Sequence, residues 1–230
     1  MSNHTHDLEK PLGTLLVEEL SCHLPYGIFS VAFGLTILSL LHTLTLMTGD
    51  VAAVTKGAKL LFHNFHFMHI IFAATGTIIT FSRFSKNLFR TILIGILSPT
   101  VFCILSDVIL PYIGARALGV TLKLHICFLT EPTRVLPFLF IGIVNGLVMS
   151  RHAHSKQSGY SLSSHAIHIF ISSMASVFYL VSSGFFDWHK QLGTIFVFLI
   201  VAVVLPCTFS DVIIPVIVAK KGRKRDGNKK

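Results

Sequence analysis

The chain has 230 residues, of which 52% are hydrophobic and only 13% are charged, with a mean hydropathy of +0.73 and a formal net charge of +9. The charged share is roughly half that of a soluble domain, so polar side chains cannot cover a water-facing surface, and a soluble enzyme is excluded. A nucleic-acid binder is excluded as well, because seven of the 19 Lys and Arg residues stand together in the segment 220–230.

Six apolar runs follow one another along the chain, each near the ~20 residues that a helix needs to cross the hydrocarbon core of a bilayer. We expect spans at 24–46, 60–82, 91–113, 135–150, 163–185 and 193–217. The fourth run is the shortest, and we expect its helix to begin earlier, within 129–134. Strands exposed to lipid would leave backbone groups unpaired. The predicted fold class is therefore an all-α integral membrane protein with six transmembrane helices in a single membrane domain, 1–230.

The basic residues indicate how these spans are oriented. With six spans, both termini and the loops at 83–90 and 151–162 share one side, which carries 13 Lys and Arg residues against 6 on the other side. By the positive-inside rule both termini are cytoplasmic, and the basic tail lies near anionic lipid. The first 23 residues lack the features of a cleaved secretory signal. We predict a multi-pass protein of a cell membrane, with the bacterial cytoplasmic membrane as the best fit.

An internal repeat divides the chain into two units of three spans. The matching segments are CILSDVILPYIGA at 103–115 with CTFSDVIIPVIVA at 207–219, HNFH at 63–66 with HAIH at 165–168, and, more weakly, the first spans at an offset of 112. The first of these pairs is identical at eight of thirteen positions. We place repeat 1 at about 15–119 and repeat 2 at about 127–223. Three is an odd number, so the second unit lies upside down relative to the first, as in many secondary transporters.

Two acidic residues lie well inside apolar spans. Asp107 and Asp211 occupy the same position of the repeated motif, and an ionisable side chain at such depth marks a functional site by default. Pro111 and Pro215 follow four residues later. A helical proline removes the hydrogen bond to the carbonyl four residues before it, so we expect the backbone oxygens of both aspartates to be available as ligands too.

Histidines accompany each aspartate. His63 and His66 are three residues apart and therefore share one helix face, and with His42 and Asp107 they fall toward the outer face. The inverted symmetry gathers the second set, which consists of His154, His165, His168 and Asp211, toward the cytoplasmic face. Three imidazoles and one carboxylate suit Zn²⁺ or another divalent transition metal such as Fe²⁺, Ni²⁺ or Co²⁺.

Several other residues are weaker candidates. Glu19 and Glu131 begin the two units at opposite faces, and each is placed to complete the site of the other unit. His69 continues the series on its helix but drifts round it. Cys103 and Cys207 are either soft ligands or small apolar fillers. The remaining histidines are expected at solvent or interface positions: His4, His6, His23, His125, His152 and His189.

The duplicated ligand sets favour a membrane transporter for a divalent transition-metal ion over an enzyme. Its expected partners are the ion and the lipid bilayer, and a homo-oligomer is compatible with the sequence. Two other functions stay open: a di-haem b-type electron-transfer protein, and a membrane-embedded metal-dependent hydrolase. The same His and Asp residues can also act only as hydrogen-bonding contacts between helices, with Ser106 and Ser210 as partners of the aspartates.

Overall fold

The structure is a computed structural model that describes the backbone of residues 11–152 and 157–227 and the side chains of 11–151 and 165–222. All regular elements in this part of the chain are helices. In chain order they are α2 (Leu12–Thr48), α3 (Val51–Ser82), α4 (Leu88–Ile104), η1 (Leu105–Ile109), α5 (Leu110–Ala117), α6 (Cys127–Thr130), α7 (Pro132–His152), α8 (Gln157–Ser182), η2 (Phe186–Gln191), α9 (Leu192–Thr208), η3 (Phe209–Ile213) and α10 (Ile214–Gly227).

Six of the helical stretches are long and apolar enough to span a membrane, which confirms the predicted number. They are Leu12–Thr48, Val51–Ser82, Leu88–Ala117, Pro132–Arg151, His165–Ser182 and Phe186–Gly222. Hydropathy located these helices but not all of their ends, because a helix continues through polar residues that have adequate helix propensity. The first helix thus begins twelve residues before the expected position 24 and ends at Thr48, because the next residue, Gly49, has a left-handed φ of 70°.

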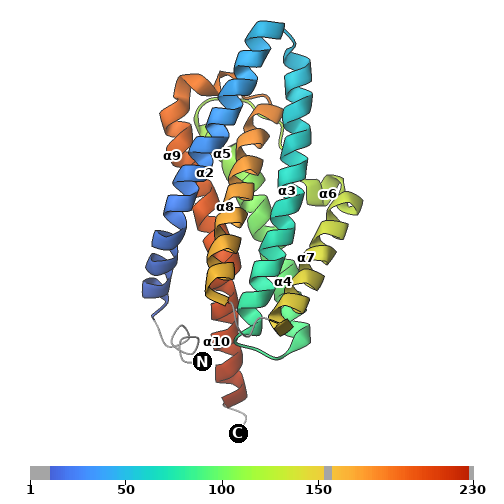
Figure 1. The fold of residues 1–230 in the computed structure, drawn as a ribbon, viewed down its shortest axis with the longest axis vertical. Coiled ribbons are helices and arrows are strands. Elements are labelled where there is room, and N and C mark those ends of the chain that lie inside the picture. The colour runs from blue at the N-terminus through green and yellow to red at the C-terminus, as the bar shows by residue number, and fades with distance from the viewer. Residues whose placement is uncertain (1–10, 153–156, 228–230) are drawn as a thin grey trace.

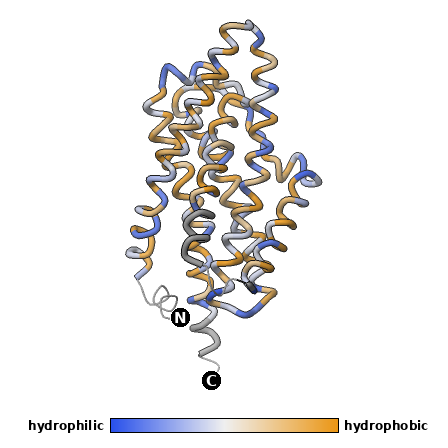
Figure 2. Tube along the Cα trace, viewed as in Figure 1, coloured by the Kyte–Doolittle hydropathy of each residue, from blue (hydrophilic) through white to orange (hydrophobic). Residues whose placement is uncertain are grey.

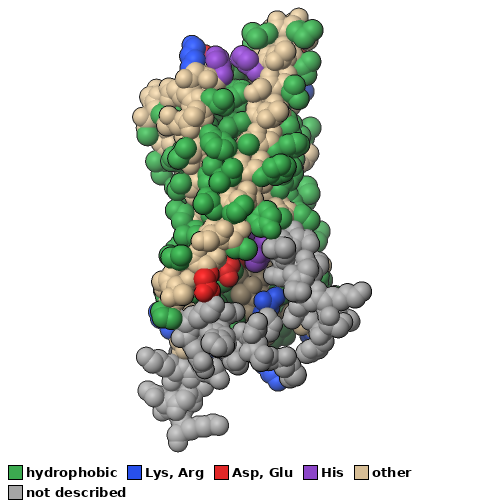
Figure 3. Space-filling view, turned by 60° about the vertical axis from the view of Figure 1, so that its left-hand side comes forward, with side chains coloured by type: hydrophobic (Ala, Val, Ile, Leu, Met, Phe, Trp, Pro, Cys, Tyr) green, Lys and Arg blue, Asp and Glu red, His purple; other side chains and the backbone are tan. Residues whose placement is uncertain are grey.

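The helices are aligned along the long axis of the molecule, and successive spans run in opposite directions (Figure 1). The start of α2 and the end of α10 lie at the same end of the bundle, which we call the termini end. The opposite end holds the turn between α2 and α3 and is called the hairpin end. Figure 2 shows hydrophobic residues along the middle of the long helices. On the face in Figure 3 a hydrophobic band separates charged and His side chains that gather toward the two ends.

The two halves of the chain pack reciprocally. The middle helices α3 and α8 pack against each other at the centre of the bundle. The first helix of each half packs on the middle helix of the other half, because α2 contacts α8 far more than α3, and α7 lies along α3. Small residues permit this close approach. An added Cβ at Gly142 of α7 would lie 2.8 Å from the carbonyl oxygen of Ile71 in α3.

Two short π-helical turns, η1 and η3, interrupt the third and sixth spans at the repeated motif. In each turn a backbone N–H bonds to the carbonyl five residues earlier, as Leu110 does to Leu105 and Ile214 does to Phe209. The next residue is a proline, which has no N–H to donate. Turns of this kind are frequent at functional sites, and each of these two carries an aspartate at its centre.

Hydroxyl groups from neighbouring helices satisfy the carbonyls that the π-turns leave open. The Ser106 carbonyl has no helical donor, since Leu110 bonds to Leu105 and Pro111 lacks an N–H. The hydroxyl of Ser176 in α8 donates to it over 3.0 Å. At the equivalent place in η3, the Ser210 carbonyl accepts from Thr77 of α3 at 3.1 Å and from Ser98 of α4 at 3.2 Å. The two π-turns are therefore each held by the middle helix of the opposite half.

Candidate functional site

The two buried aspartates are joined through two imidazoles in the middle of the bundle. His69 of α3 places its Nδ1 atom 2.7 Å from Oδ2 of Asp107, and His168 of α8 places its Nδ1 atom 2.6 Å from Oδ2 of Asp211. The Nε2 atoms of the two rings face each other at 2.7 Å. Cys207 of α9 lies beside them, with Sγ 3.7 Å from Nε2 of His69. All five side chains are buried, and we call them the central cluster.

Asp107 is the more fully hydrogen-bonded of the two carboxylates. Its Oδ2 atom also accepts a hydrogen bond from Nδ1 of His66, at a distance of 2.9 Å. Its Oδ1 atom accepts hydrogen bonds from the hydroxyl groups of Ser106 at 2.7 Å and Ser172 at 2.9 Å. The Nε2 atom of His66 is buried without a hydrogen-bond partner among the described residues. This nitrogen is therefore available to a ligand.

Asp211 is held differently. Its Oδ1 atom is buried and has no hydrogen-bond partner in the described part of the chain. The carboxylate lies against Gly76 of α3, where an added Cβ would come within 3.0 Å of Oδ2. The glycine thus provides the space that lets Asp211 reach His168.

The hydrogen bonds of the central cluster define what its imidazoles can do. A carboxylate that accepts from the Nδ1–H of a histidine leaves the Nε2 lone pair free and makes it more basic, which is the usual arrangement behind a metal-binding histidine. Both His69 and His168 have this arrangement. Two unprotonated nitrogens repel each other at 2.7 Å, so a cation, either a proton or a metal ion, belongs between them.

Ligand types and spacing decide how a metal ion would fit. One ligand atom each from His69, His168 and Cys207 lies within 4.8 Å of the other two, so this buried group could hold a metal ion. Two imidazole nitrogens on one tetrahedral Zn²⁺ are separated by about 3.3 Å, given Zn–N bonds of about 2.0–2.1 Å. The two rings must therefore move apart by a little over half an ångström for both to bind the same ion.

A second group of metal-ligand side chains lies between the central cluster and the hairpin end. Ligand atoms of His63, His125 and Cys127 lie within 4.8 Å of one another, and Nε2 of His125 is 3.9 Å from Oε1 of Glu131. Burial and the neighbouring His63 lower the pKa of His125 below its usual value. Burial raises the pKa of the Cys127 thiol to about 12. We call these four residues the hairpin-end group.

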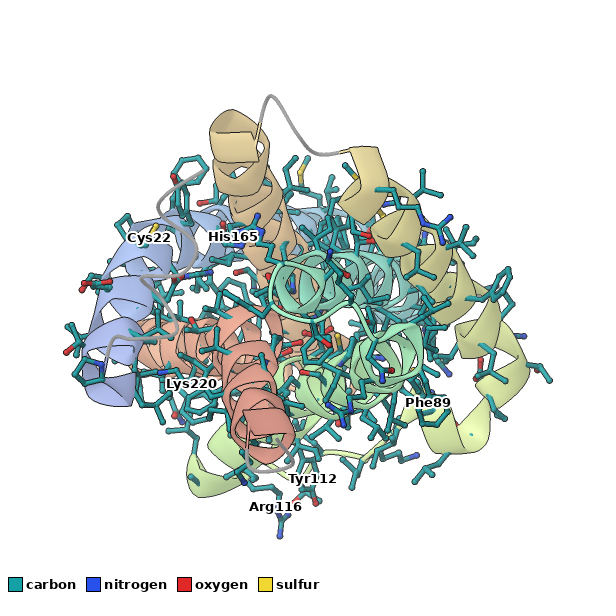
Figure 4. All side chains as sticks on the ribbon, turned by 90° about the horizontal axis from the view of Figure 1, so that it is seen from below. Cys22, Phe89, Tyr112, Arg116, His165 and Lys220 are labelled. Atoms are coloured by element: carbon teal, nitrogen blue, oxygen red, sulfur yellow. The ribbon has the colours of Figure 1, made fainter. Side chains whose placement is uncertain are left out.

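A third polar group lies between the central cluster and the termini end. The rings of His23 and His165 are 4.9 Å apart, and Nδ1 of His23 lies 2.6 Å from the backbone oxygen of Glu19 and 3.8 Å from its carboxylate. Figure 4 shows His165 on α8 beside the stretch of α2 that carries Cys22. We call Glu19, His23 and His165 the termini-end group.

The predicted ligands therefore fall into several places. His66, His168, Asp107 and Asp211 lie in one network of hydrogen bonds, which His69 connects. His63 and Glu131 both belong to the hairpin-end group. His165 and Glu19 both belong to the termini-end group. His42 lies apart, near the hairpin end, with its ring 5.0 Å from that of His189 and 6.3 Å from that of Trp188. His154 lies outside the described residues.

Four residues of these groups were not among the main ligand candidates predicted from the sequence. His69 continues the spacing of three that begins at His63, and this regularity was the available signal. Cys207 stands four residues before Asp211, on the same helix face. The prediction that His23 lies at a solvent or interface position is wrong, because only 1% of the residue is exposed. Nothing in the sequence indicated that the segment carrying His125 folds back onto α3.

Comparisons with known proteins add no identification. No protein-family model, no curated protein and no solved structure matches this chain.

Proposed function

We propose that the chain is a membrane transporter that carries a divalent transition-metal ion through the middle of its helical bundle. The observation that carries this proposal is the central cluster, in which two imidazoles are each oriented by a buried aspartate toward a common point beside a thiol. Nitrogen and sulfur ligands of this kind select borderline and soft ions such as Zn²⁺, Co²⁺, Ni²⁺ and Fe²⁺ over Mg²⁺ and Ca²⁺.

A continuous series of polar groups along the bundle supports transport. Beginning at the hairpin end, His63, His66 and His69 follow one another on α3 at intervals of three residues, or about 4.5 Å of helix rise. His69 meets His168, and His165 follows one turn away on α8. His165 in turn contacts His23. An ion that exchanges imidazole ligands step by step has a nitrogen within reach along most of the bundle.

The internal repeat supports the same function. The two halves run in opposite directions, carry π-turns at equivalent aspartates and pack reciprocally through their middle helices. We infer an inverted repeat of two three-helix units that crosses the bilayer six times, and ion sites at the interface between such repeats are common in secondary transporters. Each half contributes one His–Asp pair to the central cluster, so a relative movement of the halves would open or close the contact between His69 and His168.

The cluster suits the two alternative functions less well. A haem plane has no space between imidazole nitrogens 2.7 Å apart. A hydrolase needs an open metal position for water and a route for a larger substrate, whereas the five side chains of the central cluster are buried among helices. A bare ion is the ligand that fits with the smallest rearrangement.

The membrane setting follows from the surface of the bundle. Large apolar side chains such as Phe29, Phe140 and Val197 are more than 60% exposed, which favours contact with lipid over contact with water. We infer a multi-pass protein of a cell membrane with both termini in the cytoplasm and the basic tail near anionic lipid. Protons are suitable counter-ions, because metal binding to histidine and cysteine displaces protons.

Uptake of metal into proteoliposomes tests the proposed function. We expect purified wild-type protein to carry Co²⁺ or Zn²⁺ into vesicles, and His168→Ala to slow this uptake at least about tenfold, because it removes a central ligand. His42→Ala is the matched control and keeps the wild-type rate, since His42 lies outside the central cluster. His168→Gln provides a second variant should alanine prevent folding. Absence of wild-type flux, or equal flux in His168→Ala, His168→Gln and His42→Ala, overturns the proposal.

A further inference from the structure

We propose that His63, His125 and Cys127 form a second binding site for a divalent transition-metal ion, separate from the central cluster, at which the transported ion is captured near the hairpin end. The capture role rests on the proposed function, whereas binding of the ion does not. His63 belongs to α3, His125 to the segment between α5 and α6, and Cys127 to the short helix α6.

The first support is the state of the ligand atoms. The Nε2 atoms of His63 and His125 are both buried, and neither has a hydrogen-bond partner among the described residues. The other ring nitrogen of His63 is occupied, because Nδ1 lies 2.7 Å from the backbone oxygen of Lys59. This contact fixes the Nδ1–H tautomer and directs the free Nε2 lone pair toward the site. Unsatisfied buried nitrogens are unfavourable, and a bound cation would satisfy both.

The second support is the composition of the group. Two imidazoles and one cysteine sulfur are three of the four ligands of a tetrahedral zinc or cobalt site. Glu131 lies next to His125 and is itself held by Arg134, whose Nη1 atom is 2.9 Å from Oε2. Arg134 holds Oε2, while Oε1 lies 3.9 Å from Nε2 of His125, so this oxygen is placed to supply the fourth ligand.

The third support is access. The side chain of His125 is 29% exposed and that of Glu131 is 26% exposed, whereas Cys127 is fully buried. An ion can therefore approach the imidazole and carboxylate from outside and still reach a thiol that is shielded from solvent. The central cluster, whose members are all buried, has no comparable exposure.

The fourth support is the connection to the central cluster. His66 stands one helical turn from His63 on α3, and the ring of Phe62 contacts both imidazoles at centroid distances of 5.1 and 5.5 Å. The Nε2 atom of His66 is buried without a partner in the described part of the chain, while its Nδ1 atom already contacts Asp107. His66 is thus the intermediate ligand between the two metal sites.

Counting bound ions tests the second site. The full chain, purified in detergent, is saturated with Co²⁺, freed of loose ions by gel filtration and analysed for cobalt per chain. We expect two ions in the wild type and one in Cys127→Ser and in His125→Ala. Cys22→Ser is the matched control, because it removes an exposed thiol and should keep two ions. His168→Ala should lose the other ion, and the combination of His168→Ala with Cys127→Ser should lose both.

The outcomes separate this site from the transport proposal. Equal cobalt content in Cys127→Ser, His125→Ala and Cys22→Ser overturns the second site, whether or not the protein carries Co²⁺. Loss of one ion in both site variants supports the site even if wild-type proteoliposomes show no flux. If flux is present, the capture role predicts that Cys127→Ser raises the Co²⁺ concentration for half-maximal uptake at least about tenfold and leaves the maximal rate nearly unchanged. An unchanged half-maximal concentration overturns the capture role.

Discussion

The chemistry of the central cluster depends on which oxygen of each aspartate faces which nitrogen. Oδ2 of Asp107 accepts hydrogen bonds from two imidazoles, those of His66 and His69, whereas Oδ2 of Asp211 accepts one from His168. Each carboxylate fixes the tautomer of its histidine and strengthens the opposite nitrogen as a ligand. The aspartates would therefore influence a bound ion through the histidines, without contacting it.

Replacing one carboxylate by an amide tests this role. Asp211→Asn keeps an oxygen that can accept from His168 but removes the negative charge, so we expect the Co²⁺ affinity of the central cluster to fall about 10- to 100-fold. The protein should remain folded, because the amide is nearly the same size. Isothermal titration calorimetry measures the Kd in a Cys127→Ser background, which removes the second site.

The matched control is Asp187→Asn. Asp187 is an exposed residue that pairs with Lys190 at 3.0 Å, so loss of its charge should leave the Kd unchanged. The same Kd in Asp211→Asn and Asp187→Asn would mean that Asp211 does not support a metal ligand.

At the scale of the elements, the position of Asp211 depends on close contact between helices. The η3 turn brings its carboxylate against α3 at Gly76, and the Ser210 carbonyl beside it bonds to hydroxyls of α3 and α4. A side chain at residue 76 would occupy the space that the carboxylate uses. The helix interface and the ligand geometry are thus set by the same small residue.

Gly76→Ala should therefore weaken metal binding without unfolding the protein. The new Cβ would lie 3.0 Å from Oδ2 and 3.2 Å from Cγ of Asp211, so the carboxylate must shift relative to His168, and we expect the Kd for Co²⁺ to rise several-fold. Alanine favours a helix over glycine by about 1 kcal/mol, which offsets part of the crowding. Calorimetric titration of the variant measures the change.

Gly57→Ala is the control on the same helix, since nothing lies within 4 Å of its added Cβ. It should leave the Kd at the wild-type value. If Gly76→Ala also left the Kd unchanged, contact between α3 and Asp211 would not determine the ligand geometry.

The sequence predicted elements better than their relative positions. Hydropathy identified six helices, and the repeated motif identified Asp107 and Asp211 as buried groups. Neither hydropathy nor the repeated motif predicted that α7 lies along α3 or that α2 lies along α8. These contacts depend on the shapes of the facing helix surfaces. The two ligand sets were therefore expected near opposite faces, whereas His69 and His168 join them in the middle of the bundle.

The positions of single residues were also predicted less well than the helices that carry them. His42 matched its counterpart in the repeat, but its helix extends past the cluster and places the ring beside His189. His23 is one turn from Glu19 and looked like an interface residue, yet the packing of α2 on α8 buries it against His165. Periodicity gives the face of a helix on which a residue lies, but the neighbour of that face depends on the assembled bundle.

At the scale of the whole molecule, polar groups follow the interior while apolar side chains cover much of the outside. The hairpin-end group, the central cluster and the termini-end group succeed one another along the bundle, and exposed apolar residues occur on the surrounding helices. Buried ionisable groups are costly in a membrane and are typical of ion pathways. If the chain is the ion transporter that we propose, the contact between His69 and His168, which joins the His–Asp pairs of the two halves, is the point that controls passage.

Cobalt spectroscopy determines directly whether an ion binds between His69, His168 and Cys207. With Cys127→Ser removing the second site, we predict that Co²⁺ gives the charge-transfer band of a cobalt–thiolate bond and the visible spectrum of a tetrahedral ion. Both signals should be lost or strongly altered when Cys207→Ser is added, while Cys22→Ser should change neither. A cobalt–thiolate band that persists without Cys207, or that never appears in Cys127→Ser protein, would contradict a metal site in the central cluster.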